Sequence, residues 1–262
     1  MLYANLQDYD APINILIVGA GATGSYLTNF LARNLTALNL KNIDIVVIDF
    51  DRVEEKNLLN QNFIKSDLKK YKAEVIAQRY SKIYSNLYYI INKIEYAINN
   101  FLNMYAIIVL CVDNFETRLK IFHHCSRFLI SKIIAIIDTG VHENGGQTLL
   151  FPISHSSQYY NIRHKSGKQI FDGFKITDIV PWHIMLSKNN VSKVHCGNGI
   201  LPIWNIIGAS LATSFIIKIL TKKTIKYLGI FFGDKYKFYD CDEFYNMIRL
   251  VQGGYNDKRN NV

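Results

Sequence analysis

Three glycines at GxGxxG spacing near the start of the chain have the arrangement of a phosphate-binding turn. Gly19, Gly21 and Gly24 follow a short apolar run at 14–18, and apolar residues at helical spacing continue to about residue 33. In a strand, glycine turn and helix of this kind, free backbone amides and the helix dipole attract phosphate. The spacing therefore predicts a phosphate site, with glycines kept only for tight packing as the alternative.

Three aspartates that follow apolar runs add carboxylates to this chemistry. Asp49 lies 25 residues beyond Gly24 (49 − 24), close to the position where a carboxylate accepts hydrogen bonds from ribose hydroxyls. Asp113 and Asp138 follow two later runs. Since ligands of an open α/β sheet bind at the carboxyl ends of its strands, we expect the three side chains to converge there. The three aspartates therefore predict a nucleotide site, but they do not indicate which nucleotide binds.

The elements that position these residues alternate between apolar strands and helices. Strands are predicted at 43–48, 87–94, 106–112 and 133–137, with a helix at 73–84. The first two strands of the chain are joined by a connection long enough for a crossover helix, which parallel strands require. The sequence therefore predicts an α/β fold, a Rossmann-like, doubly wound, mostly parallel sheet with helices on both faces.

The second half of the chain is less regular. Residues 142–200 contain repeated Gly, Ser and Asn breaks, and we expect a mobile insertion or a crossover-like segment there. A helix is predicted at 203–220, followed by an antiparallel hairpin of Tyr227–Phe232 and Lys235–Tyr239. We therefore expect a single domain over 1–262, with a nucleotide-binding half at about 12–141 and a C-terminal helix and hairpin at about 201–250.

Composition and charge narrow the classes of function. The chain has 262 residues, 49% of them hydrophobic, and a formal net charge of +9, so it can bury a large core and favours acidic partners. Its most apolar stretch, 200–217, contains Pro, Asn, Gly and Ser, so we expect a buried helix and no membrane span. Aromatic residues are dispersed, and no basic stripe or recognition helix is evident. Direct nucleic-acid binding is therefore not expected.

Cysteine usage indicates a reducing compartment. Cys111, Cys125, Cys196 and Cys241 are widely spaced and form no CxxC pair, so we expect no structural zinc. The amino terminus lacks the basic-then-apolar order of a signal peptide. We expect a cytoplasmic protein.

Two longer motifs resemble those of a known enzyme family. The first is DFDRVEEKNLLNQNF at 49–63, followed by Lys72 and Ala73, and the second is CVDNFETR at 111–118. They resemble the DxD-V-x3-NLxRQ-F, lysine-alanine and C-x-D-N-x3-R segments of the ThiF, MoeB and HesA family, whose fold ubiquitin-activating enzymes share. With DTG and NGGQ within 138–147, the chain looks most like the ThiF proteins of PRTRC gene systems.

The resemblance implies ATP-dependent adenylation of the C-terminal carboxylate of a small ubiquitin-like, β-grasp protein. It implies ATP and Mg²⁺ as the cofactors and a homodimer as the usual assembly. By motif match, Asp49 holds the ribose, Lys72 neutralises the phosphates and Asp113 holds Mg²⁺. The remaining matched residues support the site: Asn57 and Gln61 contact the phosphates or brace the loop, and Asp51, Asn114 and Arg118 support the loops around them.

Two of these assignments, those of Lys72 and Asp113, have simpler alternatives. Lys72 could be a solvated lysine like Lys69 and Lys70, and Asp113 could merely cap the helix that begins near Phe115. An NAD-dependent oxidoreductase is a weaker reading of the same glycines. A cation and a Mg²⁺ ligand suit a triphosphate, whereas a dinucleotide pyrophosphate needs neither.

The chain departs from the family pattern at one position of the first motif. Asn60 stands where the family has the arginine of NLxRQ, and residues 1–12 contain no arginine that would reach a neighbouring subunit's site. Cations at these positions stabilise the charge that develops on the phosphates. Either Arg52, Lys56 or Lys65 substitutes, or the protein binds nucleotide as a non-catalytic scaffold.

Cys196 is a candidate acceptor of the activated acyl group. It lies in the polar stretch before the long apolar helix, where family members that form thioesters often carry their cysteine. A thiolate there would attack the acyl-adenylate and release AMP. An inert, partly buried thiol is the alternative. Cys111, Cys125 and Cys241 are expected to be structural.

Overall fold

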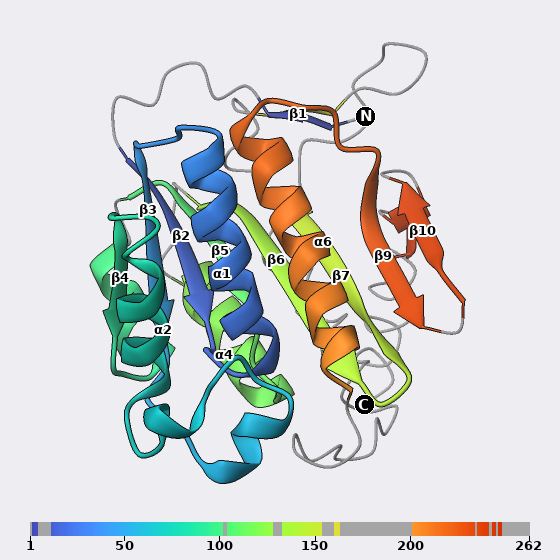
Figure 1. The fold of residues 1–262 in the computed structure, drawn as a ribbon. Coiled ribbons are helices and arrows are strands. Elements are labelled where there is room, and N and C mark those ends of the chain that lie inside the picture. Colours follow the sequence, from blue (N-terminus) through green and yellow to red (C-terminus); the bar gives the residue numbers. More distant parts are fainter. Residues whose placement is uncertain are drawn as a thin grey trace.

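An eight-stranded mixed sheet forms the centre of the computed structural model (Figure 1). Its strand order is β10-β9-β7-β6-β5-β2-β3-β4, and a separate two-stranded sheet joins β1 to β8. The structure describes residues 2–4, 12–101, 104–127, 133–153, 160–162, 201–233, 235–240, 243–244 and 246–247. The strands are β1 Leu2–Ala4, β2 Ile13–Val18, β3 Ile43–Ile48, β4 Leu87–Ile90, β5 Ala106–Leu110, β6 Ile133–His142, β7 Gly145–Pro152, β8 Tyr160–Ile162, β9 Tyr227–Gly233 and β10 Lys237–Asp240.

Helices cover both faces of the large sheet. In Figure 1, α1 and α6 lie side by side in front of it and α4 lies behind it. The α-helices are α1 Ala22–Ala37, α2 Lys72–Tyr80, α3 Ile94–Ala97, α4 Phe115–Arg127 and α6 Pro202–Leu220, and the 3-10 helices are η1 Glu55–Leu59, η2 Lys65–Asp67 and η3 Ile98–Phe101.

The parallel half of the sheet is the buried core. β2, β3 and β5 are apolar almost throughout, and every residue of β2 and β5 is buried. Strands that are covered on both faces by helices require this continuous apolar pattern. β4, β3, β2, β5 and β6 run parallel, whereas β7, β9 and β10 pair antiparallel to their neighbours. The predicted fold class and its C-terminal hairpin are therefore confirmed.

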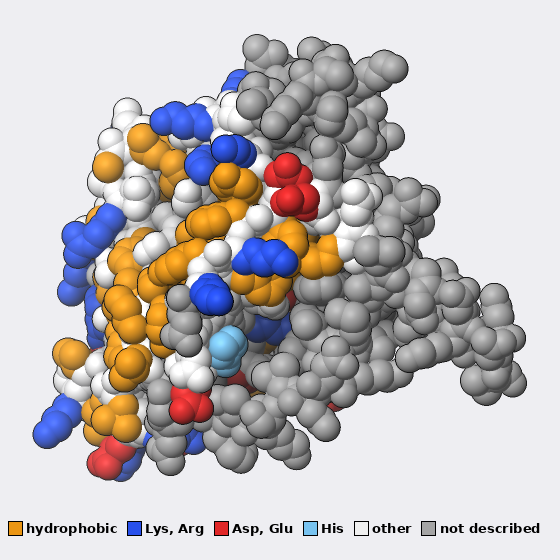
Figure 2. Space-filling model, turned by 90° about the vertical axis from the view of Figure 1, so that its right-hand side faces the viewer, with side chains coloured by type: hydrophobic (Ala, Val, Ile, Leu, Met, Phe, Trp, Pro, Cys, Tyr) orange, Lys and Arg blue, Asp and Glu red, His pale blue; other side chains and the backbone are white. Residues whose placement is uncertain are grey.

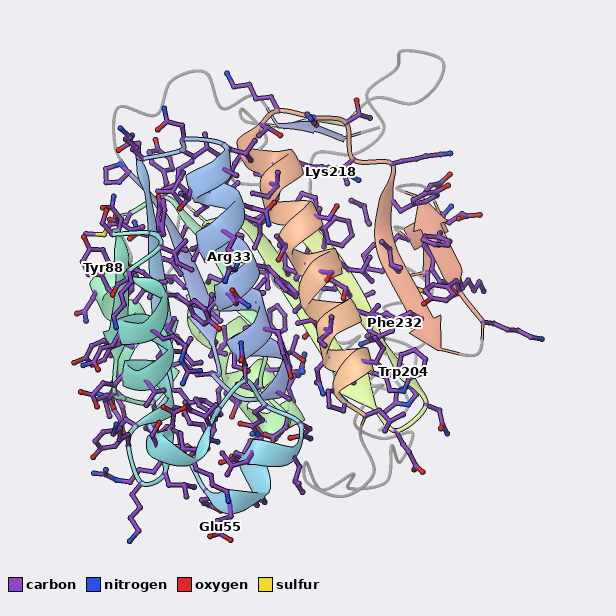
Figure 3. All side chains as sticks on the ribbon, in the orientation of Figure 1. Arg33, Glu55, Tyr88, Trp204, Lys218 and Phe232 are labelled. Carbon is purple, nitrogen blue, oxygen red and sulfur yellow. The ribbon has the colours of Figure 1, made fainter. Side chains whose placement is uncertain are left out.

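The apolar helix α6 packs on α1 and on the middle of the sheet (Figure 3). A Cβ at Gly208 would lie 3.0 Å from Thr139 Oγ1, so the missing side chain allows close approach to β6. By length and composition alone, α6 would suffice to cross a membrane, since its most apolar 18-residue window has a mean hydropathy of 1.7. Half of that window is buried inside the protein. One face of α6 is therefore used for packing within the domain.

Two boundaries differ from the sequence prediction. A mobile insertion or a crossover-like segment was expected at 142–200, yet β7 within it pairs along its whole length with β6 and over Gly145–Leu149 with β9. Residues 154–159 and 163–200 lie outside the described residues. The strand predicted at 87–94 ends at Ile90, because its neighbour β3 ends at the paired Ile48. The β6–β7 hairpin set the first boundary and the pairing of β4 with β3 set the second, and hydrophobic periodicity alone reports neither pairing.

Candidate functional site

Two of the three glycines of the turn are required by its packing. Gly19 has φ +94°, and a Cβ there would lie 2.9 Å from the carbonyl oxygen of Cys111. A Cβ at Gly24 would lie 1.9 Å from the carbonyl oxygen of Gly19, which no side chain tolerates. These contacts hold the start of α1 tightly against the ends of β2 and β5. For these two positions, the packing role is real.

Gly21 has a different environment. A Cβ there would meet its nearest neighbour, Gln61 Nε2, only at 4.0 Å, so no contact within the described protein requires a glycine. Gly21 is the N-cap of α1, it makes no side-chain cap, and the first turn of α1 contains no acidic residue. The amides at the start of this helix are therefore available to an anion from outside. The open space at Gly21 and the free backbone amides at the start of α1 together make this turn suited to binding phosphate.

Asp49 connects the glycine turn to the next loop. Its Oδ2 accepts a hydrogen bond from the Ala20 amide at 2.7 Å, and its Oδ1 accepts one from the Asp51 amide, also at 2.7 Å. Burial raises the pKa of the Asp49 carboxyl, although Lys72 and these two amides act in the opposite direction. Each oxygen keeps a lone pair for a further donor, such as a ribose hydroxyl.

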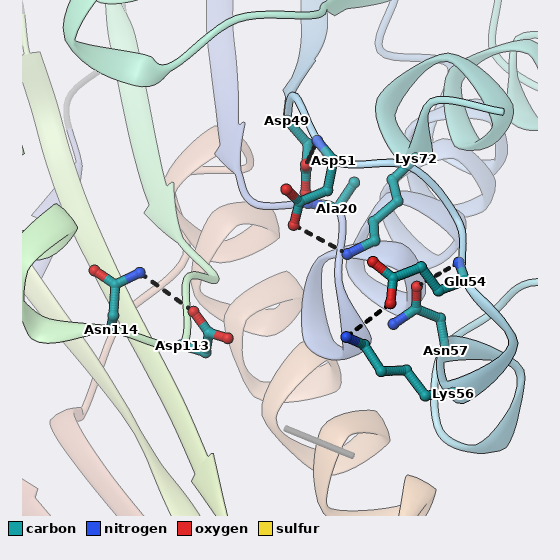
Figure 4. A network of polar contacts seen from close by, with 9 residues as sticks. All are labelled: Ala20, Asp49, Asp51, Glu54, Lys56, Asn57, Lys72, Asp113 and Asn114. Carbon is teal, nitrogen blue, oxygen red and sulfur yellow. Dashed lines mark hydrogen bonds and ion pairs between the residues drawn. The ribbon is translucent and has the colours of Figure 1, made fainter. Parts of the chain in front are cut away.

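Lys72 is buried beside the same loop. It begins α2, only 8% of its surface is exposed, and its Nζ lies 3.2 Å from Asp51 Oδ2 (Figure 4). Lys69 and Lys70, by contrast, are exposed. A desolvated ammonium that is held by one carboxylate is unlike a solvated surface lysine. The structure therefore does not support the solvated alternative for Lys72.

The loop that carries η1 is held by its own side chains. Asn57 is buried, and its Oδ1 accepts a hydrogen bond from the Glu54 amide at 2.8 Å, so it braces the loop. Gln61 and Asn60 are also buried, but Gln61 Oε1 and Asn60 Oδ1 have no hydrogen-bond partner within the described protein. Unpaired buried polar atoms cost free energy and often mark a ligand site.

A second set of contacts fixes this loop to the helices beside it. The Asn62 amide donates to Ser25 Oγ at 3.1 Å, and Asn62 Nδ2 donates to Tyr80 Oη at 2.7 Å. Arg79 donates to the carbonyl oxygen of Asn62 at 2.6 Å and forms an ion pair with Asp67. The loop that faces the glycine turn therefore has a fixed backbone.

Asp113 lies after β5, across the glycine turn from Lys72 (Figure 4). Its carboxylate is exposed and accepts one hydrogen bond from Asn114 Nδ2 at 3.3 Å. Asn114, not Asp113, caps α4, because Asn114 Oδ1 accepts from the Thr117 amide at 2.8 Å. The capping alternative for Asp113 is therefore wrong. An exposed carboxylate suits Mg²⁺, which keeps several waters and takes its other ligands from phosphates.

The prediction that Asp138 joins this site is wrong. Asp138 lies inside β6, 1% of its surface is exposed, and it forms an ion pair with Arg118. Arg118 also donates to the carbonyl oxygens of Val112 and Thr139. Burial lowers the pKa of Arg118 to about 10, so the guanidinium remains charged at neutral pH. This buried pair supports the loop that presents Asp113.

The structure describes only part of the predicted thiol chemistry. The side chains of Cys125, Cys196 and Cys241 lie outside the described residues. Cys111 is described, and burial raises the pKa of its thiol to about 12, as expected of a structural cysteine. Among the described residues, no group of three or more His, Cys, Asp or Glu side chains is arranged to hold a metal ion.

For one contact of the site, the sequence does not indicate which two residues meet. Thr23 in the glycine turn donates from Oγ1 to Asn205 Oδ1 of α6 at 3.1 Å, although the two residues are 182 positions apart. Both side chains are buried, and Asn205 Nδ2 has no hydrogen-bond partner within the described protein. An asparagine in an apolar helix predicts a buried polar contact, but it does not name the partner.

Solved structures of E. coli MccB share this fold. For MccB with ATP, the TM-score is 0.59 at 18% identity, with 87% of this chain and 62% of that chain covered. For MccB with AMPCPP and SeMet MccA, the TM-score is 0.58 at 18% identity, with 88% and 64% covered. The chain thus spans less than two thirds of the length of MccB. Comparison with curated protein sequences gives no match.

A family profile covers nearly the whole chain. The profile of the ThiF family matches residues 7–256. This range includes the glycine turn, the buried Lys72 and the exposed Asp113, which the structure places around the ends of β2, β3 and β5. The chain therefore belongs to the ThiF family.

Proposed function

We propose that this protein is an ATP-dependent adenylyltransferase that activates a carboxylate as an acyl-adenylate. The observation that carries the proposal is the placement of Lys72 and Asp113 on two sides of the uncapped glycine turn. A buried ammonium, free helix amides and an exposed carboxylate together suit a triphosphate with Mg²⁺. A dinucleotide cofactor would need neither the ammonium nor the metal ligand. An oxidoreductase is therefore disfavoured.

The reaction joins a carboxylate oxygen to the α-phosphorus of ATP and breaks the bond between the α-phosphorus and the bridging oxygen of pyrophosphate. Negative charge develops on the phosphates, and fixed cations and amides stabilise it without reorganisation. In this protein, the amides at the start of α1 and the Lys72 ammonium would supply that stabilisation, while Asp49 holds the ribose. Asp113 would hold Mg²⁺, which supplies further charge neutralisation when bound.

The carboxylate belongs, in this proposal, to the C-terminus of a small ubiquitin-like, β-grasp protein. The net charge of +9 favours an acidic partner, and the similarity to ThiF proteins of PRTRC systems remains a prediction that points the same way. One of the MccB structures contains AMPCPP together with SeMet MccA. Transfer of the acyl group to Cys196 would follow adenylation. We place the reaction in the cytoplasm.

We further propose that the protein acts as a homodimer without a membrane or nucleic-acid partner. Figure 2 shows a band of hydrophobic side chains, with basic side chains beside it, on the side of the molecule where β9 and β10 lie. Tyr236 and Phe238 of this region are 55% and 45% exposed, and their rings stack. Exposed apolar bands of this kind mark protein interfaces. Light scattering of the purified protein tests the dimer.

A non-catalytic nucleotide-binding scaffold is the second candidate. Asn60 replaces the family arginine, and because asparagine is uncharged this position supplies no cation to the phosphates. Asn60 is 4% exposed, and its Oδ1 has no hydrogen-bond partner within the described protein. A scaffold would bind ATP without forming an adenylate. The buried Lys72 together with the exposed Asp113 favours catalysis, because a protein that only holds a nucleotide has no need of a cation and a Mg²⁺ ligand placed to stabilise charge that develops in a reaction.

ATP–pyrophosphate exchange in the presence of Mg²⁺ tests the proposal. The protein is assayed alone and with candidate ubiquitin-like proteins encoded by neighbouring genes. Exchange that requires one acceptor and is lost in Asp113→Asn supports adenylation. ATP binding without exchange for every acceptor supports the scaffold instead. Absence of ATP binding would refute both.

A further inference from the structure

The site lacks one family arginine, and the arginines that the structure describes around it already have fixed partners. Arg52 stacks on Tyr71 at 3.8 Å and donates to the carbonyl oxygen of Lys69 at 2.6 Å. Arg79 and Arg118 form ion pairs with aspartates and donate to backbone carbonyls. Moving any of them to a phosphate would break several of these interactions. They are therefore poor substitutes for the missing cation.

Lys56 is held much more weakly and lies in the same network (Figure 4). Its Nζ lies 2.7 Å from Glu54 Oε2, and both side chains are 60% exposed. Glu54 raises the pKa of Lys56, and Asp51 adds to this effect, so the ammonium lies within electrostatic range of the carboxylate that Lys72 contacts. An exposed ion pair contributes little to stability. The lysine can therefore exchange this partner at small cost.

The backbone beneath Lys56 is fixed, so its side chain can move without disturbing the loop. The Asn57 amide donates to the carbonyl oxygen of Glu54 at 2.9 Å, and the Gln61 amide donates to the carbonyl oxygen of Asn57 at 3.0 Å. The Asn57 side chain closes the same turn onto the Glu54 amide. The Cα of Lys56 is therefore fixed, while the four methylenes of its side chain can rotate and let the ammonium change its position.

Position along the site indicates which phosphates Lys56 would reach. Asp49 marks the ribose end, Lys72 lies next, and Lys56 lies beyond Lys72 in Figure 4. Lys72 is buried whereas Lys56 is exposed. Within the proposed ATP site, the outer phosphates lie farthest from the ribose. This order would place Lys56 nearer to the β- and γ-phosphates than to the α-phosphate.

We propose that Lys56 binds the β- and γ-phosphates of ATP and substitutes for the missing arginine, and that Glu54 holds it in place until the nucleotide arrives. This inference rests on the proposed function. Binding exchanges one carboxylate partner of the ammonium for phosphate oxygens, without any covalent change. Glu54 and ATP then compete for Lys56, so removal of the glutamate charge favours the nucleotide.

Equilibrium binding of Mg²⁺-ATP and of AMP tests the proposal. Lys56→Ala is expected to weaken ATP binding about tenfold, the size typical of a lost charged hydrogen bond, and to leave AMP binding unchanged. Lys56→Arg is expected to bind ATP as well as the wild type does. Glu54→Gln is expected to bind ATP at least as tightly. Lys120→Ala is the matched control, since Lys120 also forms an exposed 2.7 Å pair with a glutamate, Glu116.

The outcomes separate this inference from the proposed function. If the wild type binds ATP and Lys56→Ala binds it equally well, the role of Lys56 is refuted while adenylation stands. An equal loss of ATP and AMP binding in Lys56→Ala would also refute it, because the outer phosphates would not be the partner. If the wild type binds no ATP, the proposed function fails and this inference fails with it.

Discussion

The Lys72 ammonium lies 3.2 Å from Asp51 Oδ2, and the two side chains differ sharply in exposure. The lysine side chain is 10% exposed, whereas that of the aspartate is 54% exposed (Figure 4). The ammonium is therefore held at the border between the protein interior and the space in front of the glycine turn. An ammonium has three donors, so this contact leaves capacity for a phosphate.

Replacement of this lysine tests its role directly. Lys72→Ala is expected to reduce ATP–pyrophosphate exchange at least about 100-fold, because a fixed cation that stabilises developing charge contributes at least that much. Lys70→Ala is the control, since Lys70 lies two residues away and is exposed. Both variants are checked for native circular dichroism. Exchange in Lys72→Ala within about twofold of the Lys70→Ala rate would contradict the assignment.

Different glycines of the turn are expected to serve packing and phosphate binding. Gly24→Ala is expected to lower stability by about 2 kcal/mol or more, because its Cβ would lie 1.9 Å from a backbone oxygen and the backbone must shift. At about 2–4 °C per kcal/mol for a chain of this size, the melting temperature falls by at least about 4 °C.

Gly21→Ala is the variant to compare with Gly24→Ala. Its Cβ would have no neighbour closer than 4.0 Å, so the melting temperature is expected to stay within about 1 °C of the wild type. The added methyl group would stand in the space for phosphate, and ATP binding is expected to weaken. Thermal melts and ATP titrations of both variants measure the contrast. A large drop in stability for Gly21→Ala would refute this division of roles.

The buried pair of Arg118 and Asp138 is expected to be structural. Asp138→Asn keeps the shape but leaves the buried guanidinium without its counter-charge, at a cost of about 3 kcal/mol or more in urea unfolding. The double variant Arg118→Met, Asp138→Leu removes both charges and is expected to recover much of that stability. Equal stability of Asp138→Asn and the wild type would show that the pair is dispensable.

The sequence alone predicts the parts of the site that follow from local chain order. Gly19, Gly21 and Gly24 with the strand before them fix the turn, and Asp49 follows from its spacing after them. The buried position of Lys72 agrees with its motif. These features depend on short segments in which the hydrophobic pattern and the glycines are compatible with few other local structures.

Contacts between separate elements produced the features that the sequence analysis did not predict. Asp138 looked like a strand-end carboxylate, but β6 continues past it because β7 pairs with it from Asp138↔Leu149 to His142↔Gly145. Thr23 meets Asn205 only because α1 and α6 pack together. The register of the β6–β7 hairpin and the packing of α1 on α6 depend on two elements at once, and the hydrophobic pattern of either element alone does not report them.

The last prediction concerns which cysteine accepts an acyl group. Burial raises the pKa of Cys111 to about 12, so only about one thiol in ten thousand is ionised at pH 8, and the thiolate is the nucleophile. Cys111 should therefore form no thioester and should resist iodoacetamide. Its labelling rate, followed by peptide mass spectrometry, should rise about tenfold per pH unit between pH 8 and 11.

If the proposed transfer occurs, Cys196 is the expected acceptor. A complex with the acceptor protein that is stable in detergent and cleaved by dithiothreitol should form with Mg²⁺-ATP and disappear in Cys196→Ser. The matched variant Cys111→Ser should keep it, because its thiol is held in the neutral form by burial. Exchange of pyrophosphate should continue in Cys196→Ser, since adenylation precedes transfer. Persistence of the complex in Cys196→Ser would exclude this cysteine and leave adenylation untouched.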